Sequence, residues 1–428
     1  MRILIKKAQI VNFDKIIEAD LLIEGGKITE IAKNISGPAD KKISAGGKCV
    51  FPGFIDLHSH LRTPGREDEE DFLSGSTAAA KGGFTTIFCM PNTQPPIDNE
   101  GLASWVVEES RRLNLIDIYP VGAITKNRAG KELTEFAALK RAGCLALSDD
   151  GNSIASSLIL RRAYEYAKMS GLLIISHCED KQLANNGSMR ESLIASKYGI
   201  PGVPDIAESL VVARNIELAK YLDVRIHLAH ISSAKSIEII KRAKKEGVKV
   251  TAETCPHYFV LTVDDIEKSN FSGNLKVNPP LGDEEDKKAI RRALAQGVID
   301  CIATDHAPHS LAEKELPFEA APPGFIGLEL AFSLTNTYLV KEKVIDLRGI
   351  ADKLSAQPAA IAGLAGYGKV TPGAAADLVI ADLSKTWKVV EKNIASKSKN
   401  TPFLGQELTG VIESTIKKGK IVYTRQEE

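Results

Sequence analysis

Short apolar runs alternate with helix-like segments through most of the chain. The β-prone runs recur eight times, at 51–57, 84–89, 115–121, 143–148, 172–177, 224–229, 249–254 and 300–304. The segments between them carry the apolar spacing of amphipathic helices, at 99–114, 131–142, 153–170, 205–221, 233–246 and 284–296. Eight β/α units over about 300 residues predict a parallel (β/α)₈ barrel, the TIM-barrel class of α/β fold.

Both ends of the chain depart from this alternation. Residues 1–50 contain short β-prone pieces separated by glycine pairs, and the same texture returns from about residue 366 to residue 428. We expect the two ends to form one small β-sandwich beside a barrel of residues 51–365. A separate meander at each end of the chain is the alternative.

The composition excludes several classes of partner. The 55 basic and 55 acidic residues cancel, so bulk charge indicates neither a nucleic-acid nor a membrane partner. Six scattered cysteines without a C-x-x-C pair indicate buried free thiols in a reducing compartment. No run approaches about eighteen consecutive apolar residues, and the N-terminus has no signal-peptide pattern, so we expect a cytoplasmic protein.

Candidate metal ligands follow the predicted strands, at the end where catalytic residues of such barrels lie. In chain order they are His58 and His60, Asp149 and Asp150, His177, His230, and Asp305. An extended strand would direct His58 and His60 to the same face. Each residue alone could be a surface or turn residue, but together they predict a site for one or two divalent ions. This nitrogen and oxygen ligand set suits Zn²⁺ better than Ca²⁺ or Mg²⁺.

Several motifs resemble the amidohydrolase superfamily and, within it, the class I dihydroorotases. They run through nearly the whole chain and read PGFIDLHSHLR, MPNTQPP, SDDG, VNPPL, ATDHAPH and TPGAAADLVIADL. The resemblance implies a metal-dependent (β/α)₈ barrel flanked by a β-sandwich built from both termini. It also implies that His58, His60 and Asp305 bind the more buried metal, and that His177 and His230 bind a second one.

The residues at the end of the fourth predicted strand distinguish dihydroorotases from their close relatives. Hydantoinases, dihydropyrimidinases and allantoinases also resemble the chain, notably in ETCPHY at 253–258, but they bridge their metals with a carbamylated lysine. This chain has SDDG there and no lysine. Asp150 stands where class I dihydroorotases have a bridging aspartate, with Asp149 as the one-residue alternative. We therefore expect a dihydroorotase. An inactive scaffold that binds a transcarbamoylase is a further alternative, although such scaffolds lose ligand histidines that this chain keeps.

The resemblance also implies a reaction. In the family, metal-activated water reversibly opens the cyclic amide of dihydroorotate to N-carbamoyl-aspartate, a step of pyrimidine biosynthesis. Asp305 would take the proton of the water and return it to the leaving ring nitrogen. We expect a homo-oligomer, with aspartate transcarbamoylase as a candidate partner.

A substrate with a ring carboxylate calls for a cation near the metal. Arg62 lies two residues after His60, on the same face of an extended strand, and can clamp a carboxylate through two parallel hydrogen bonds. By motif match, the resemblance adds Asn92 and His309 as carboxylate contacts and Asn278 as a contact to the ring amide.

Residues 310–324 are rich in proline, alanine and glutamate and have no strand signal, so we expect an active-site loop. Many class I members end this loop with Phe-Gly, whereas this chain has Pro323 and Gly324. A substrate contact at these two residues would therefore be through the backbone.

Overall fold

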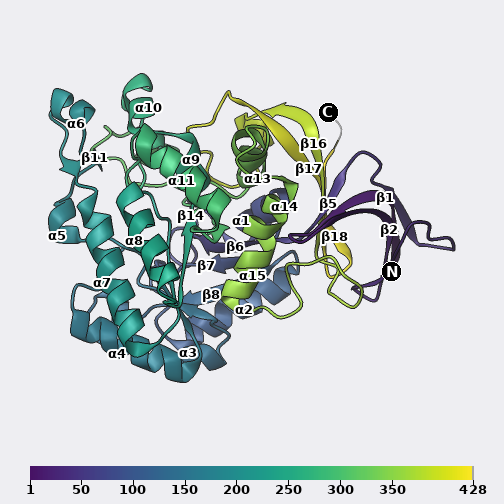
Figure 1. The fold of residues 1–428 in the computed structure, drawn as a ribbon, viewed down its shortest axis with the longest axis horizontal. Helices are drawn as coiled ribbons and strands as arrows, with labels where there is room; N and C mark the ends of the chain where they lie inside the picture. Colours follow the sequence, from purple (N-terminus) through teal and green to yellow (C-terminus); the bar gives the residue numbers. More distant parts are fainter. Residues whose placement is uncertain (427–428) are drawn as a thin grey trace.

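The computed structural model describes residues 1–426 and shows a parallel barrel beside a second sheet (Figure 1). The eight barrel strands are hydrogen-bonded in chain order. They are β6 (Phe54–Ser59), β7 (Phe84–Cys89), β8 (Asp117–Gly122), β9 (Ala146–Leu147), β10 (Leu173–Ser176), β13 (Ile226–Leu228), β14 (Val250–Thr254) and β15 (Cys301–Ile302). A parallel bridge between Ser59 and His306 joins the first strand to the segment after the last. The predicted (β/α)₈ fold is confirmed.

Helices cover the outside of the barrel between successive strands. The longer ones are α1 (Phe72–Lys81), α2 (Glu100–Leu113), α3 (Phe136–Arg141), α4 (Ser157–Ser170), α7 (Ile206–Leu222), α8 (Ala234–Lys245) and α11 (Glu284–Gln296). α2 begins after Asn99, whose side chain accepts from the Leu102 N–H, and ends at Asn114 in the left-handed conformation. α11 begins with a capping box of Asp283 and Asp286. These caps satisfy backbone groups that a helix end leaves unpaired.

Shorter elements occupy the remaining connections. They are α5 (Lys181–Ala184), β11 (Met189–Arg190), α6 (Leu193–Tyr198), β12 (Gly202–Val203), α9 (Pro256–Val260), α10 (Val263–Lys268), α12 (Leu311–Lys314), α13 (Ala331–Thr335), α14 (Leu347–Ala351) and α15 (Gln357–Ala362). α15 lies at the amino-terminal end of the strands, because Arg225, just before β13, donates to the Ile361 carbonyl at 3.0 Å. The opposite end of the barrel is left for the site.

The second sheet uses both ends of the chain. Its strands are β1 (Arg2–Val11), β2 (Ile16–Glu24), β3 (Lys27–Ala32), β4 (Lys41–Ser44), β5 (Cys49–Pro52), β16 (Leu378–Lys388), β17 (Glu407–Lys417) and β18 (Lys420–Thr424). β5 joins the two halves, because it pairs in parallel with β1 and antiparallel with β16. The predicted flanking β unit from both termini is confirmed, and the alternative of two separate meanders is wrong.

The run predicted as one strand over 51–57 is divided between the two sheets. Its first residues complete β5, and the chain enters the barrel as β6 directly after Gly53. A Cβ at Gly53 would lie 2.2 Å from Thr85 Oγ1, so the backbones approach closely here. The sequence could not show this division, because residues 51–57 are all buried and apolar character is nearly continuous.

The six cysteines are buried and free, as the sequence predicts. Burial raises the pKa of the Cys144 and Cys178 thiols to about 12, so they behave as small apolar side chains. Within residues 1–426, no helix is long and apolar enough to cross a membrane.

Candidate metal centre and active site

The side chains predicted as metal ligands converge at the carboxyl ends of the barrel strands, and all are buried. His58 Nε2 lies 3.3 Å from Asp150 Oδ1 and 3.6 Å from Asp305 Oδ1. His60 Nε2 lies 3.1 Å from Asp305 Oδ1. Among the described residues, two groups made up only of predicted ligands have ligand atoms within 4.8 Å of one another: His58, His60 and Asp305, and His58, Asp150 and His230.

His177 completes the cluster. Its Nδ1 lies 2.8 Å from His230 Nε2 and 3.8 Å from Asp150 Oδ1. His230 Nε2 lies 3.7 Å from the same Asp150 oxygen. Asp150 therefore lies between His58 on one side and the two later histidines on the other, as a ligand shared by two ions would.

Asp149 faces a different part of the barrel. Its Oδ1 accepts from the backbone N–H groups of Ile124 and Thr125 at 2.8 and 3.0 Å, and its Oδ2 accepts from the Thr125 hydroxyl. Asp149 thus fixes the loop after β8. The structure brings Asp150, and not its neighbour, to the histidines.

The donor set fits a divalent cation. His58 donates from Nδ1 to Glu253 at 3.0 Å, which leaves its buried Nε2 without a hydrogen-bond partner beside Asp150 and Asp305. Burial lowers the pKa of His58, but these three carboxylates more than reverse that effect and hold it well above its usual value. The cluster therefore requires a positive charge, which a metal ion would supply in place of a proton.

His60 and Asn92 act together. His60 donates from Nδ1 to Asn92 Oδ1 at 2.7 Å, which turns Nε2 toward the other ligands. Burial lowers the pKa of His60, so its ring is the neutral imidazole that metal binding requires. On the other side of the centre, Asn278 hydrogen-bonds Glu179, whose carboxylate lies 3.4 Å from His177 Nε2. Asn92 thus contacts one histidine of the cluster directly, and Asn278 is linked to a second one through Glu179.

Arg62 reaches this region by a backbone turn. β6 ends at Ser59, and Arg62 has a φ of 57°, in the left-handed region, so the predicted strand alternation does not extend to it. Its Nε donates to the Pro308 carbonyl at 2.9 Å and pairs with Glu69 at 3.1 Å. Its Nη2 lies 3.2 Å from His309 Nε2. Two of the three predicted carboxylate contacts, Arg62 and His309, are thus neighbours.

The end of the predicted loop lies against His309. The Pro323 carbonyl is 2.9 Å from His309 Nε2. Gly324 has a φ of 121°, and a Cβ there would lie 2.6 Å from Ala307 Cβ. Glycine is therefore required at this position, where the backbone comes close to the site.

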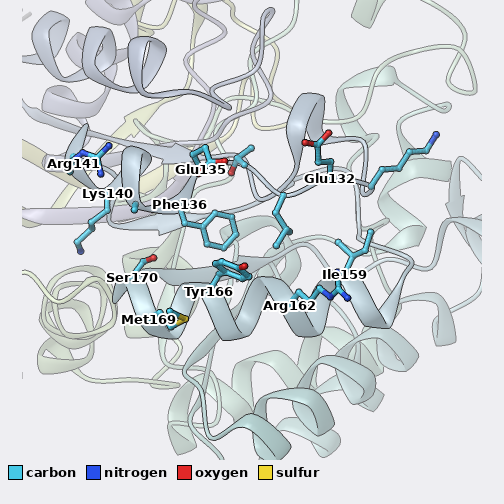
Figure 2. Close-up of a pocket in the computed structure, with 14 residues that line it drawn as sticks. Glu132, Glu135, Phe136, Lys140, Arg141, Ile159, Arg162, Tyr166, Met169 and Ser170 are labelled. Carbon is cyan, nitrogen blue, oxygen red and sulfur yellow. The ribbon is translucent and has the colours of Figure 1, made fainter.

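A hollow of about 900 Å³ lies outside the barrel, between α3 and α4 (Figure 2). Its lining includes Phe136, Ile159 and Tyr166, with Lys140 and Arg162 among the charged residues. None of the predicted site residues lines it. This hollow is therefore separate from the metal centre.

Comparison with known proteins identifies the family. Residues 47–236 match the model described as Dihydro-orotase-like, and residues 211–423 match the Amidohydrolase family. The dihydroorotase of Geotalea daltonii is 45% identical over 99% of this chain and 100% of its own length. That of Caldicellulosiruptor saccharolyticus is 46% identical over 98% of each chain. The chain belongs to the dihydroorotase family.

Solved hydantoinase structures share the fold of this dihydroorotase-family chain. The L-hydantoinase (dihydropyrimidinase) from Arthrobacter aurescens has a TM-score of 0.87 and 28% identity, covering 99% of this chain and 96% of its own. The dihydropyrimidinase from Brevibacillus agri has a TM-score of 0.86 and 25% identity, covering 99% and 95%. Sequence identity is higher to the dihydroorotases, which favours the dihydroorotase assignment over the other cyclic amidases.

Two acids that hold the site were not predicted from the sequence. Glu253 in β14 accepts from His58 Nδ1 and from His227 Nε2, each at 3.0 Å. The sequence feature that could have identified Glu253 is its position near the end of a predicted strand. Glu69 binds both Arg62 and His309, but it lies in the charged run REDEED, which is typical of a solvated loop.

We expect Glu253→Ala to weaken metal binding by about 10- to 100-fold, the usual effect of losing a partner that orients a ligand histidine. Burial raises the pKa of Glu253, but His227 and His58 lower it to about 2, so it is an anion that fixes the Nδ1–H tautomer of His58. Glu253→Gln keeps the size of the side chain and one hydrogen-bond acceptor, so it should lose less metal affinity than Glu253→Ala. Competition with a chelating dye measures the affinity, and unchanged affinity in Glu253→Ala would contradict this role.

Proposed function

We propose that this protein is a dihydroorotase, which reversibly hydrolyses the cyclic amide of (S)-dihydroorotate to N-carbamoyl-L-aspartate in pyrimidine biosynthesis. The observation that carries the proposal is the full-length similarity to curated dihydroorotases. The presence of Asp150 among the ligands, at a strand end without lysine, supports it. The four retained histidines favour an enzyme over an inactive scaffold. Turnover of dihydroorotate by the purified protein tests the proposal.

The metal that we propose is Zn²⁺, at one or two sites in each chain. The support is the buried set of imidazoles and carboxylates and its unpartnered His58 nitrogen. His58, His60 and Asp305 would hold one ion, and His177 and His230 the second, with Asp150 between them. When bound, zinc supplies Lewis acidity and lowers the pKa of a water molecule to about 7.

Asp305 is the proposed general base and acid. Burial raises its pKa, but the hydrogen bond from His60 and the nearby His58 outweigh burial and hold that pKa well below its usual range. Asp305 is therefore ionised at neutral pH and can accept the proton of the attacking water. It returns this proton to the leaving ring nitrogen, and ring closure uses the same transfers in reverse.

The proposed substrate subsite lies beside this aspartate. Arg62 would clamp the ring carboxylate through its terminal nitrogens, since its Nε already donates to a backbone carbonyl. His309 and Asn92 would add carboxylate contacts, and Asn278 a contact to the ring amide. Backbone groups of Pro323 and Gly324 would border the ring.

We also propose that the protein forms a homo-oligomer. The support is the exposed large apolar side chains of α4 and α7, of which Met169 is 83% and Tyr221 is 72% exposed. Large apolar side chains grouped at a surface are typical of contact sites. Aspartate transcarbamoylase remains a predicted partner on the resemblance alone, and the buried free thiols support a cytoplasmic location.

The carboxylate bridge leads to a prediction about the second metal. Because Asp150 needs no carbamylation, activity should be independent of bicarbonate, and Asp150→Ala should lose the second metal before the first. Asp149→Asn is the matched control, and its metal content should be unchanged. Elemental analysis measures the metals. A carbamylated lysine at the site, found by mass spectrometry, would overturn the assignment.

A further inference from the structure

Lys314 is a buried cation next to the proposed carboxylate subsite. Lys314 is only 4% exposed. Its Nζ donates to the carbonyl oxygens of Pro322 at 2.8 Å and of Gly324 at 2.9 Å. Within residues 1–426, these carbonyl oxygens are its hydrogen-bond partners, and it forms no ion pair with a carboxylate. A buried ammonium without a counter-charge is costly, so this arrangement calls for an explanation.

More positive than negative charge surrounds Lys314. Burial lowers the pKa of Lys314 the most, and the nearby charges of Lys276 and Arg62 lower it further. Glu313 raises it only in part, so the pKa falls to about 7. Glu313 is itself paired with Arg66 at 2.9 Å. Glu69 and Glu313, the carboxylates of this region, are thus paired with arginines, and within residues 1–426 no carboxylate pairs with Lys314 itself.

The turn that Lys314 holds also borders the subsite. Lys314 binds the carbonyls on either side of Pro323, and the Pro323 carbonyl lies 2.9 Å from His309 Nε2. His309 in turn lies 3.2 Å from Arg62 Nη2. A displacement of the Lys314 ammonium would therefore move the backbone against which His309 is set.

We propose that Lys314 is a positioning residue that makes the site specific for a ring bearing a carboxylate. Its ammonium holds the Pro322–Gly324 turn against His309 and supplies positive charge that the substrate carboxylate neutralises on binding. The inference rests on the proposed function, because the carboxylate distinguishes dihydroorotate from dihydrouracil. An uncharged ring gains nothing from this charge.

Steady-state kinetics of Lys314→Met and Lys314→Arg test the proposal. Lys314→Met should raise the KM for dihydroorotate about tenfold or more, the scale of one lost charge interaction, while kcat and metal content change less. Lys314→Arg should restore most of the affinity. Near neutral pH, binding of the anion raises the Lys314 pKa, so calorimetry in different buffers should show proton uptake that Lys314→Met lacks.

Lys353→Met is the matched control. Lys353 is also buried, and it donates to the backbone carbonyl of Ile299 at 3.2 Å and pairs with Asp352 at 3.2 Å. Ile299 lies just before β15, so this lysine is at the other end of the barrel. This variant should lose stability without a change in KM or proton uptake. If Lys314→Met behaves in the same way, Lys314 is purely structural and the proposal is wrong.

A different result is expected if the proposed function itself is wrong. In that case the wild-type protein would not turn over dihydroorotate, whatever residue occupies position 314. Calorimetry with dihydroorotate and dihydrouracil would still decide the role of Lys314. Preference for the anion that disappears in Lys314→Met would support the inference, and equal or absent binding of both rings by the wild type would overturn it.

Discussion

Asp305→Asn should abolish turnover in both directions, by about 10²- to 10⁴-fold from the loss of proton transfer alone. The amide cannot accept the proton of the attacking water. N-carbamoyl-aspartate has two carboxylates and dihydroorotate has one, so ring closure consumes a proton and is favoured as pH falls. In the wild-type protein, the rate of hydrolysis should rise with pH and the rate of ring closure should fall. Both rates measured against pH test this.

Metal content distinguishes the proposed role of Asp305 as a metal ligand from its proposed role in proton transfer. His58 and His60 should still hold some metal in Asp305→Asn, which elemental analysis would detect. Asp300→Asn is the matched control: Asp300 pairs with Lys244 at 2.6 Å before β15, away from the centre, so activity should persist. An Asp305→Asn protein with its metal and near-normal turnover would remove Asp305 from the mechanism.

Arg62→Met should lose most activity on dihydroorotate. Removing one partner of a buried charge pair costs about 2–5 kcal/mol, which corresponds to about 30- to 4,000-fold in kcat/KM. Arg62→Lys should recover part of this, because a lysine keeps the charge but not the two parallel hydrogen bonds. The low activity expected on dihydrouracil should change little, since that ring has no carboxylate.

Activity on uncharged rings distinguishes a carboxylate clamp from a structural role for Arg62. If Arg62→Met lowers activity on dihydrouracil and dihydroorotate equally, the guanidinium has a structural role, with Glu69 and His309 as its partners. Kinetic constants on both substrates, with metal content measured on the same samples, decide between these results.

The sequence predicted the barrel and the metal cluster because both depend on repeated local patterns. Apolar runs of strand length mark the barrel, and a polar residue after a run marks the end of a strand. His177 and His230 could be placed in this way although 53 positions separate them. The resemblance favoured Asp150 over Asp149, and the structure places Asp150 beside the histidines and Asp149 against the loop after β8.

The remaining features depend on contacts between distant residues. Glu69 lies in an acidic run but is 1% exposed, because Arg62 and His309 surround it. Nothing local distinguishes Lys314 from a solvated lysine, yet the turn at Gly324 folds over it. Arg62 was expected on a strand face, but its left-handed backbone reaches the site by another route. Such features follow from packing and not from periodicity.

The most direct test of this account is the kcat/KM of the purified protein for dihydroorotate, dihydrouracil, hydantoin and allantoin without added bicarbonate, with zinc determined in the same sample. We expect one or two zinc ions per chain, turnover of dihydroorotate in both directions, and poor turnover of the other rings. A metal-loaded protein that opens hydantoin, dihydrouracil or allantoin as fast as dihydroorotate, or leaves dihydroorotate unchanged, would contradict it.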